Sequence, residues 1–226
     1  NDTRRTLLAL NAAGADIIEI GMPFSDPLAD GSTIQASSQK ALENGMNLKL
    51  MFEQLKGIRQ ETDIPVVLMG YINPVMVFGV EAFCEKCQEV GIDGLILPDL
   101  PLWEFENIYK PVFEKYGLHN IFLVTPQTSD ERVRLLDAAS GGFLYAVSVS
   151  TTTGSSGRFD DAQENYFKRL SELNLNNPIL VGFGIAGAEN FNIANKYLNG
   201  GVVGSAFIRA LEKDGDVEGF VKMIRG

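Results

Sequence analysis

The feature that most constrains the fold is an alternation of short apolar runs with amphipathic stretches along almost the whole chain. The runs predict strands at residues 16–21, 65–71, 94–98, 121–125, 142–148, 178–184 and 201–205. Most of these runs are apolar on both faces, which is typical of parallel strands covered by helices. The segments between them, such as 102–113 and 130–139, predict helices. This alternation indicates an α/β fold with a parallel sheet.

The number of strands leaves two architectures open. A (β/α)8 barrel, the TIM barrel, has eight strands and commonly about 250 residues. This chain has 226 residues and opens directly on a helical pattern. We therefore expect a single barrel domain over residues 1–226 that is N-terminally incomplete, with its first strand before Asn1. The alternative is an open doubly wound sheet, which accepts any number of strands.

Composition and charge exclude several classes of function. The net charge of −10 argues against a nucleic acid or an anionic membrane as the main partner. We expect no signal peptide, and we find no apolar run of about 18 residues, the length that a membrane helix needs. Cys84 and Cys87 have C-x-x-C spacing, but they lie in a helical pattern and no second cysteine pair completes a zinc site. We interpret them as two small side chains on one helical face, and the low cysteine content favours a cytoplasmic location.

One strand carries a charge in an apolar setting. Glu19 lies between Ile18 and Ile20, and alternation turns it to the opposite face. Partial burial should raise its pKa toward the range useful for proton transfer. A structural ion pair inside the barrel is the alternative. Asp26 and Asp30 follow in a proline-rich loop. Either could simply cap the helix predicted from Ser32.

Glycine-rich turns follow the last two predicted strands. The segments 181–184 and 200–206 allow the backbone to approach an anion closely, and Ser205 begins a predicted helix whose N–H groups could bind phosphate. Tight turns without a ligand are the alternative. Tyr145 lies in a strand, and the polar residues after it could form a lid or an ordinary loop.

Other chemistries find little support. The single histidine, His119, precedes a predicted strand and so lies at the wrong end of a barrel for a triad or a metal centre. No P-loop motif is present, and no lysine lies in a predicted strand to form a Schiff base. Carboxylate acid–base chemistry on a phosphorylated small molecule remains.

The residues from Glu19 to Gly31 closely resemble the signature of the tryptophan synthase alpha subunit family. Further matches follow in the family's order at Tyr71 and Asn73, at 98–101, at 182–185 and at 204–206. The resemblance implies an eight-stranded barrel that cleaves indole-3-glycerol phosphate to indole and glyceraldehyde 3-phosphate. It also implies a beta subunit partner, in an alpha2-beta2 assembly, that carries pyridoxal phosphate, with no cofactor or metal in this chain.

The resemblance assigns roles residue by residue. Glu19 is the acid–base group, and Asp30 accepts the indole N–H. The remaining roles are substrate contact for Tyr145, Thr153, Met69, Ile96 and Leu123, phosphate binding for Gly154, Gly184, Gly204 and Ser205, and beta-subunit contact for Pro23, Asp26 and Asn73. Thr153 matches a lid threonine of the family that also orients Asp30.

Two departures from the family pattern keep alternatives open. The first strand is absent, and Thr151 stands where the family usually has glycine. Because a threonine at φ > 0 is strained, lid closure is in doubt. A non-catalytic or weakly active barrel that mainly binds and activates a beta subunit is therefore the alternative function. Another phosphate-binding barrel, such as a sugar phosphate isomerase, explains the glycine turns but not the long Glu19–Gly31 match.

Overall fold

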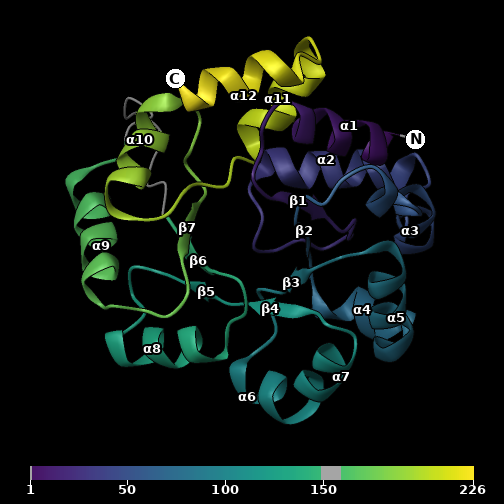
Figure 1. Cartoon of the computed structure of the whole chain (residues 1–226), viewed down its shortest axis with the longest axis horizontal. Helices are drawn as coiled ribbons and strands as arrows, with labels where there is room; N and C mark the ends of the chain where they lie inside the picture. Colours follow the sequence, from purple (N-terminus) through teal and green to yellow (C-terminus); the bar gives the residue numbers. More distant parts are fainter. Residues whose placement is uncertain (1, 149–158) are drawn as a thin grey trace. The chain divides into compact units, whose positions relative to one another are not determined.

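The computed structural model describes residues 2–148 and 159–226, and the chain divides into two compact units. The first unit is Asn1–Asn120 and the second is Ile121–Gly226. In both units helices alternate with strands, and the paired strands are parallel (Figure 1). The predicted α/β class is therefore confirmed, whereas a single domain over 1–226 stays a prediction.

The first unit contains a sheet in the order β1-β2-β3-β4. Its strands are β1 (Ile18–Gly21), β2 (Val66–Met69), β3 (Gly94–Ile96) and β4 (His119–Ile121), which ends at the boundary with the second unit. Its helices are α1 (Asp2–Ala12), α2 (Ser32–Glu43), α3 (Leu48–Leu55), the 3-10 helix η1 (Ile58–Gln60), α4 (Ile72–Phe78), α5 (Val80–Val90), α6 (Leu102–Glu104), the π-helix η2 (Phe105–Tyr109) and α7 (Lys110–Lys115).

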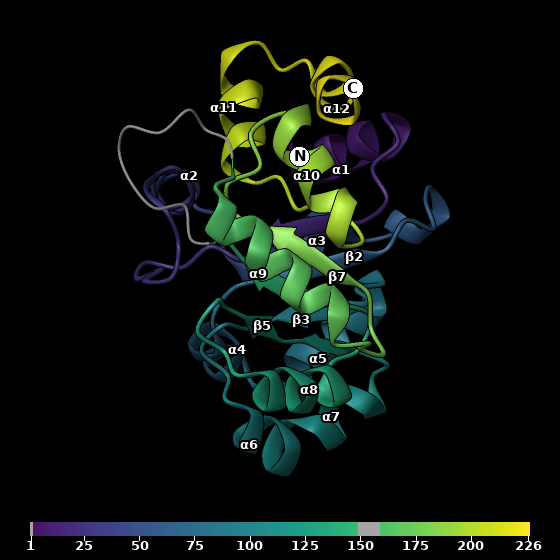
Figure 2. The ribbon, with the colours of Figure 1, turned by 90° about the vertical axis from the view of Figure 1, so that its left-hand side faces the viewer.

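The second unit contains a sheet in the order β5-β6-β7. Its elements are β5 (Leu123–Val124), α8 (Asp130–Ala139), β6 (Leu144–Val147), α9 (Asp161–Glu172), β7 (Ile179–Gly182), α10 (Ala188–Tyr197), α11 (Ser205–Lys213) and α12 (Val217–Arg225). Helix α9 covers one face of this sheet (Figures 1 and 2), and the hydroxyl of Tyr166 on α9 donates to the carbonyl of Val124 at 3.0 Å.

Apolar side chains of the strands, together with aromatic side chains from the surrounding helices and loops, form the core of each unit. In the first unit, Phe52, Phe78 and Phe83 pack edge to face, with ring centroids 5.5 to 6.1 Å apart. In the second unit, Phe159 and Phe167 pack edge to face at 5.1 Å. Each fully buried side chain of this size contributes about 1.5–3 kcal/mol to folding.

Three predicted elements are wrong in detail. The strand expected at 121–125 is divided between β4, which ends at Ile121, and β5, which begins at Leu123. The strand expected at 201–205 is reduced, within the described residues, to an isolated bridge between Val181 and Gly201. Glycines weaken a strand, and Ser205 already begins α11. The helix expected at 102–113 contains a π-helical segment. Pro111 follows this segment and has no N–H to donate to the carbonyl four residues earlier, so the regular hydrogen-bond ladder is interrupted there.

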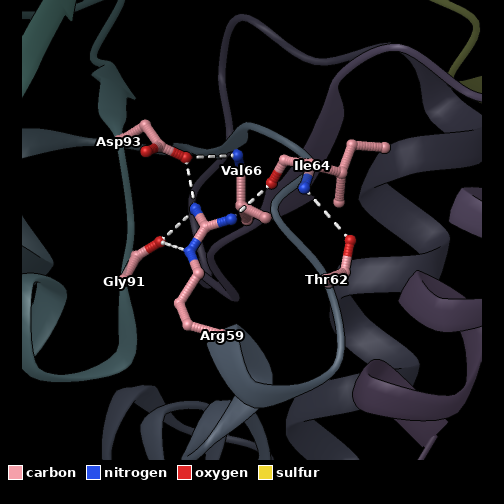
Figure 3. A network of polar contacts seen from close by, with 6 residues as sticks. All are labelled: Arg59, Thr62, Ile64, Val66, Gly91 and Asp93. Atoms are coloured by element: carbon pink, nitrogen blue, oxygen red, sulfur yellow. Dashed lines mark hydrogen bonds and ion pairs between the residues drawn. The ribbon is translucent and has the colours of Figure 1, made fainter.

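One arginine fixes the amino ends of β2 and β3 (Figure 3). The Arg59 guanidinium donates to the carbonyl of Ile64 at 2.6 Å, to the carbonyl of Gly91 and to the carboxylate of Asp93. The same carboxylate accepts the N–H of Val66 at 2.7 Å. Gly91 has φ +82, and a Cβ there would lie 2.4 Å from the arginine side chain, so a side chain at this position is excluded twice. This network stabilises the register at the amino ends of β2 and β3, whereas Met69 and Ile96 lie at the carboxyl ends of the same strands.

Candidate functional site

Glu19 lies in β1 on a face that it shares with apolar residues of the neighbouring strands. The register pairs Glu19 with Val67, and two residues further on it pairs Gly21 with Met69 and Met69 with Ile96. Paired residues of parallel strands point to the same side, and so do residues two apart in one strand. Met69 and Ile96 therefore lie on the Glu19 face, one step nearer the carboxyl ends of the strands. These two predicted indole contacts are thus next to each other and on the expected face.

One oxygen of the Glu19 carboxyl group is buried without a hydrogen-bond partner among the described residues. This atom, Oε2, is inaccessible to solvent. Burial raises the pKa of Glu19 to about 7, and the negative charge of Asp30 adds to this effect. Both effects disfavour the charged form. Glu19 can therefore exchange a proton near neutral pH, which is what a general acid–base group requires.

Asp30 ends the loop between β1 and α2 and is half-buried. Its Oδ2 accepts a hydrogen bond from the hydroxyl of Tyr71 at 3.3 Å, and its carbonyl accepts one from the side chain of Gln35 at 3.0 Å. Burial raises the pKa of Asp30, whereas the bond from Tyr71 lowers it. Glu19, Asp30 and Tyr71 are called the carboxylate cluster below.

The expectation that Asp26 or Asp30 caps the following helix is wrong. The N-cap residue of α2 is Gly31, which makes no side-chain capping bond. The Asp26 carboxylate instead accepts a bond from the adjacent Ser25 hydroxyl. The Asp30 side chain accepts a hydrogen bond from the Tyr71 hydroxyl. The interpretation of Asp30 as a simple helix cap therefore loses its main support.

In the second unit the sheet register places two predicted substrate contacts side by side. Leu123 of β5 pairs with Tyr145 of β6, and Tyr145 pairs with Leu180 of β7. The buried Tyr145 ring occupies the space above Gly182, where a Cβ would lie 2.0 Å from the ring. The ring also contacts Phe183 edge to face at 6.3 Å. Gly182 is therefore required for the position of Tyr145.

The segment 182–184, called the glycine turn below, follows β7 in an unusual conformation. Phe183 has φ +67 and Gly184 has φ +75, so two successive residues are left-handed. The hydroxyl of Ser148 donates to the carbonyl of Phe183 at 2.6 Å, and the side chain of Asn190 donates to the carbonyl of Gly184 at 2.6 Å. Because a left-handed non-glycine residue is costly, these two buried side chains must hold the turn in place.

The other predicted phosphate contacts lie at the start of α11. Gly204 is the exposed N-cap residue, makes no side-chain capping bond and is followed by Ser205 as the first helical residue. The first N–H groups of a helix have no partner within the helix and favour anions. An anion bound at this helix end would satisfy them.

The predicted roles of several further residues stay predictions. Thr153 and Gly154 lie outside the described residues, as does Thr151. Pro23 and Asp26 lie in the β1–α2 loop and Asn73 in the first turn of α4, where Asp26 and Asn73 are exposed. Sequence reasoning gave no role to Ser148 or Asn190. A buried asparagine within α10 was the available signal, because buried amides need partners.

Thiol and metal chemistry find little support in the part of the chain that the structure describes. Cys84 and Cys87 are buried within α5, and burial raises the pKa of the Cys84 thiol to about 12. The described residues contain no cluster of three or more histidine, cysteine, aspartate or glutamate side chains suited to a metal ion. None of the described helices is both long and apolar enough to span a membrane.

Comparison with known proteins agrees with this arrangement. The family model described as tryptophan synthase alpha chain matches residues 1–223. The tryptophan synthase alpha chain of Flavobacterium psychrophilum is 59% identical over 95% of this chain and 85% of its own. That of Flavobacterium johnsoniae is 56% identical over 100% of this chain and 90% of its own.

Solved structures give the same answer. A structure of the tryptophan synthase a2b2 complex from Pyrococcus furiosus matches with a TM-score of 0.89 and 35% identity over 98% of this chain and 91% of the other. An alpha-subunit mutant structure from the same organism matches with a TM-score of 0.88 and 33% identity, covering 98% and 91%. With a family match along nearly its whole length and relatives above half identity, the chain belongs to the tryptophan synthase alpha chain family.

Proposed function

We propose that this protein cleaves indole-3-glycerol phosphate to indole and glyceraldehyde 3-phosphate, as a carbon–carbon lyase in tryptophan biosynthesis. The observation that carries the proposal is Glu19, a buried acid with a pKa of about 7 on the same sheet face as Met69 and Ile96. A group with this pKa is available in both protonation states near neutral pH. The apolar neighbours suit an indole ring.

The reaction needs proton transfers at three atoms. Protonated Glu19 delivers its proton to ring carbon C3, while Asp30 accepts the proton of the indole N–H. The Glu19 carboxylate then takes the proton of the glycerol hydroxyl next to the bond that breaks. The C–C electron pair moves into the ring, the hydroxyl carbon becomes the aldehyde, and the ring nitrogen regains its proton from Asp30. One buried acid thus serves twice, which requires its pKa to lie close to the working pH.

The remaining predicted residues bind and orient the substrate in this proposal. Tyr145 and Leu123 contact it, together with Thr153. The backbone N–H groups at Gly184, Gly204 and Ser205, with Gly154, bind its phosphate. This part rests on the family resemblance, on the left-handed glycine turn and on the uncapped start of α11.

The proposal includes a partner. The Pyrococcus furiosus relative forms an a2b2 complex, and we propose that this chain binds a beta subunit through the loop with Pro23 and Asp26 and through Asn73 at the start of α4. Pyridoxal phosphate belongs to that subunit. A cytoplasmic location is part of the same proposal.

The test measures both products from indole-3-glycerol phosphate, with and without a beta subunit from a related organism. We expect indole and glyceraldehyde 3-phosphate in equal amounts, faster with the beta subunit. A chain that accelerates tryptophan formation from supplied indole, yet releases no indole itself, would support the non-catalytic alternative and overturn the proposed cleavage.

A further inference from the structure

We propose that Tyr71 is a positioning residue that orients the Asp30 carboxylate, and that Asp99 holds Tyr71 in place through the first N–H of α4. This inference rests on the proposed role of Asp30 and adds to it. Tyr71 and Asp99 belong to matched family segments, but neither residue has a chemical role in the sequence analysis.

The Tyr71 hydroxyl engages two successive residues of a distant loop. It accepts the N–H of Ala29 at 2.9 Å and donates to Oδ2 of Asp30 at 3.3 Å. The ring is buried, and it packs against Phe24 of the same loop at 5.2 Å. One side chain therefore holds both the backbone and the carboxylate of the loop that carries Asp30.

In the part of the chain that the structure describes, little else restrains that carboxylate. Within the described residues, the bond from Tyr71 is the one hydrogen bond to an Asp30 carboxylate oxygen. Gln35 and the turn from Pro27 restrain the backbone of Asp30 and leave its side chain free to rotate. Loss of the Tyr71 hydroxyl should therefore disorder the carboxylate while the loop keeps its path.

Asp99 holds the backbone of Ile72, the residue that follows Tyr71. Tyr71 precedes α4 in an extended conformation, and Ile72 is the first helical residue. Both carboxylate oxygens of Asp99 lie within hydrogen-bond distance of the Ile72 N–H, at 3.0 and 3.2 Å. A negative charge at a helix start is favourable, and this N–H has no partner within the helix. Asp99 thus replaces the missing N-cap side chain of α4 from the loop after β3.

The electrostatics keep Tyr71 in its donating form. Burial raises the pKa of Tyr71 to about 12, and the charges of Asp30 and Asp99 act in the same direction. The hydroxyl therefore keeps its proton throughout the neutral range. In return, its hydrogen bond lowers the pKa of Asp30 and favours the ionised form that accepts the indole proton.

The decisive variant is Tyr71→Phe, which keeps the ring and removes the hydroxyl. We expect kcat for indole release to fall about 10- to 100-fold with KM changed less than about threefold, because orientation of a catalytic group acts on the chemical step. The acid limb of the kcat/KM profile should move to higher pH, since Asp30 loses a bond to its ionised form. The matched control is Tyr116→Phe, whose exposed hydroxyl also donates to a carboxylate, that of Glu81 at 3.2 Å.

Variants of Asp99 provide a second, independent test, in which a conservative substitution should restore most of the activity. Asp99→Ala removes the acceptor for the Ile72 N–H, whereas Asp99→Asn retains a carbonyl oxygen. We expect Asp99→Ala to lower kcat about 3- to 10-fold and Asp99→Asn to retain most of it. The double variant Tyr71→Phe/Asp99→Ala should be no slower than Tyr71→Phe alone, because Asp99 acts through Tyr71. Additive losses would overturn the link between Asp99 and Tyr71.

A measurement that does not depend on catalysis distinguishes a failure of this inference from a failure of the proposed function. In protein with 13C-labelled aspartate, Tyr71→Phe should raise the pKa of the Asp30 carboxyl and leave those of exposed aspartates unchanged. An unchanged Asp30 titration would overturn the positioning role, whatever the activity. A shifted titration in a chain whose Asp30→Asn variant keeps full activity would support the positioning contact and reject the proposed function instead.

Discussion

The carboxylate cluster of the first unit and the glycine turn of the second are built in opposite ways. In the cluster, side chains carry the proposed chemistry. Burial raises the pKa of both Glu19 and Asp30, and the charge of Asp30 raises that of Glu19 further. In the glycine turn, the exposed backbone at Gly184 carries the proposed function, and the side chains of Ser148 and Asn190 only hold it.

This difference has a physical reason. A proton-transfer group must change charge near neutral pH, which a buried carboxyl can do and a peptide N–H cannot. A phosphate site needs fixed donors whose strength does not depend on pH, which backbone N–H groups provide. Changes in the cluster should therefore alter chemistry and pH dependence at little cost to folding. Changes in the turn should weaken binding and folding together.

The largest expected effect is that of Glu19→Gln on catalysis. The variant keeps the shape of the side chain but cannot transfer a proton, so kcat for indole release should fall about 1,000-fold while KM stays nearly constant. The measurement is steady-state indole release with the beta subunit present. The exposed Glu53→Gln on α3 is the matched control. Full activity of Glu19→Gln would contradict the side-chain chemistry assigned to the cluster.

The same variant should become more stable than the parent protein as the pH rises. The folded-state pKa of Glu19 is about 7 against an ordinary 4.5, so folding favours the protonated form. Below about pH 4.5 this costs nothing. Between pH 4.5 and 7 the parent loses stability relative to Glu19→Gln, and above pH 7 the deficit is constant at about 3 kcal/mol. Urea unfolding of both proteins at pH 5 and pH 8 measures it, and a pH-independent difference would show that Glu19 ionises normally.

The third effect is that of Gly184→Ala on the turn. The residue has φ +75, and a Cβ there would lie 3.0 Å from the Phe159 ring and 3.2 Å from the Ser148 hydroxyl. We expect KM for the phosphorylated substrate to rise about 10- to 100-fold, because a shifted N–H loses a bond to a charged group. Stability should fall by about 1–2 kcal/mol.

Gly142→Ala is the matched control for this change. Gly142 has φ +82 with nothing near its Cβ position, and it precedes β6 rather than following a strand. It should show the same backbone cost with an unchanged KM. Equal KM values for the two variants would reject a binding role for Gly184.

The sequence predicts the elements well where one local rule decides. Alternation identified the faces of β1, and the buried charge of Glu19 singled it out without any relative. Most strand ends were predicted one or two residues too long. At Pro65 and Pro98 the reason is that a proline is apolar but cannot donate to the ladder. At 201–205 the apolar pattern was outweighed by its glycines.

The site is less predictable because its parts act across long sequence separations. Asp30 could not be distinguished from Asp26 by spacing, and what separates them in the structure is the Tyr71 hydroxyl, 41 positions away. The Asn190 contact with Gly184 depends on how α10 packs, which no local pattern encodes. Hydrogen bonds between side chains and distant loops are a consequence of the fold, so they appear only once the fold is known.

The smallest expected effect is that of Ser148→Ala, which tests whether the glycine turn differs from the carboxylate cluster in its dependence on pH. Ser148→Ala removes the hydroxyl that donates to the carbonyls of Gly182 and Phe183, which should destabilise the protein by about 1 kcal/mol and raise KM about two- to fivefold. Because no titrating group is involved, the kcat/KM pH profile should not move, in contrast to Tyr71→Phe. Ser171→Ala is the control, since its exposed hydroxyl also donates to a backbone carbonyl, that of Lys168 at 2.7 Å. A displaced pH profile for Ser148→Ala would show that the two regions are not independent, because a purely structural change in the turn would then reach the pKa of Glu19 or Asp30.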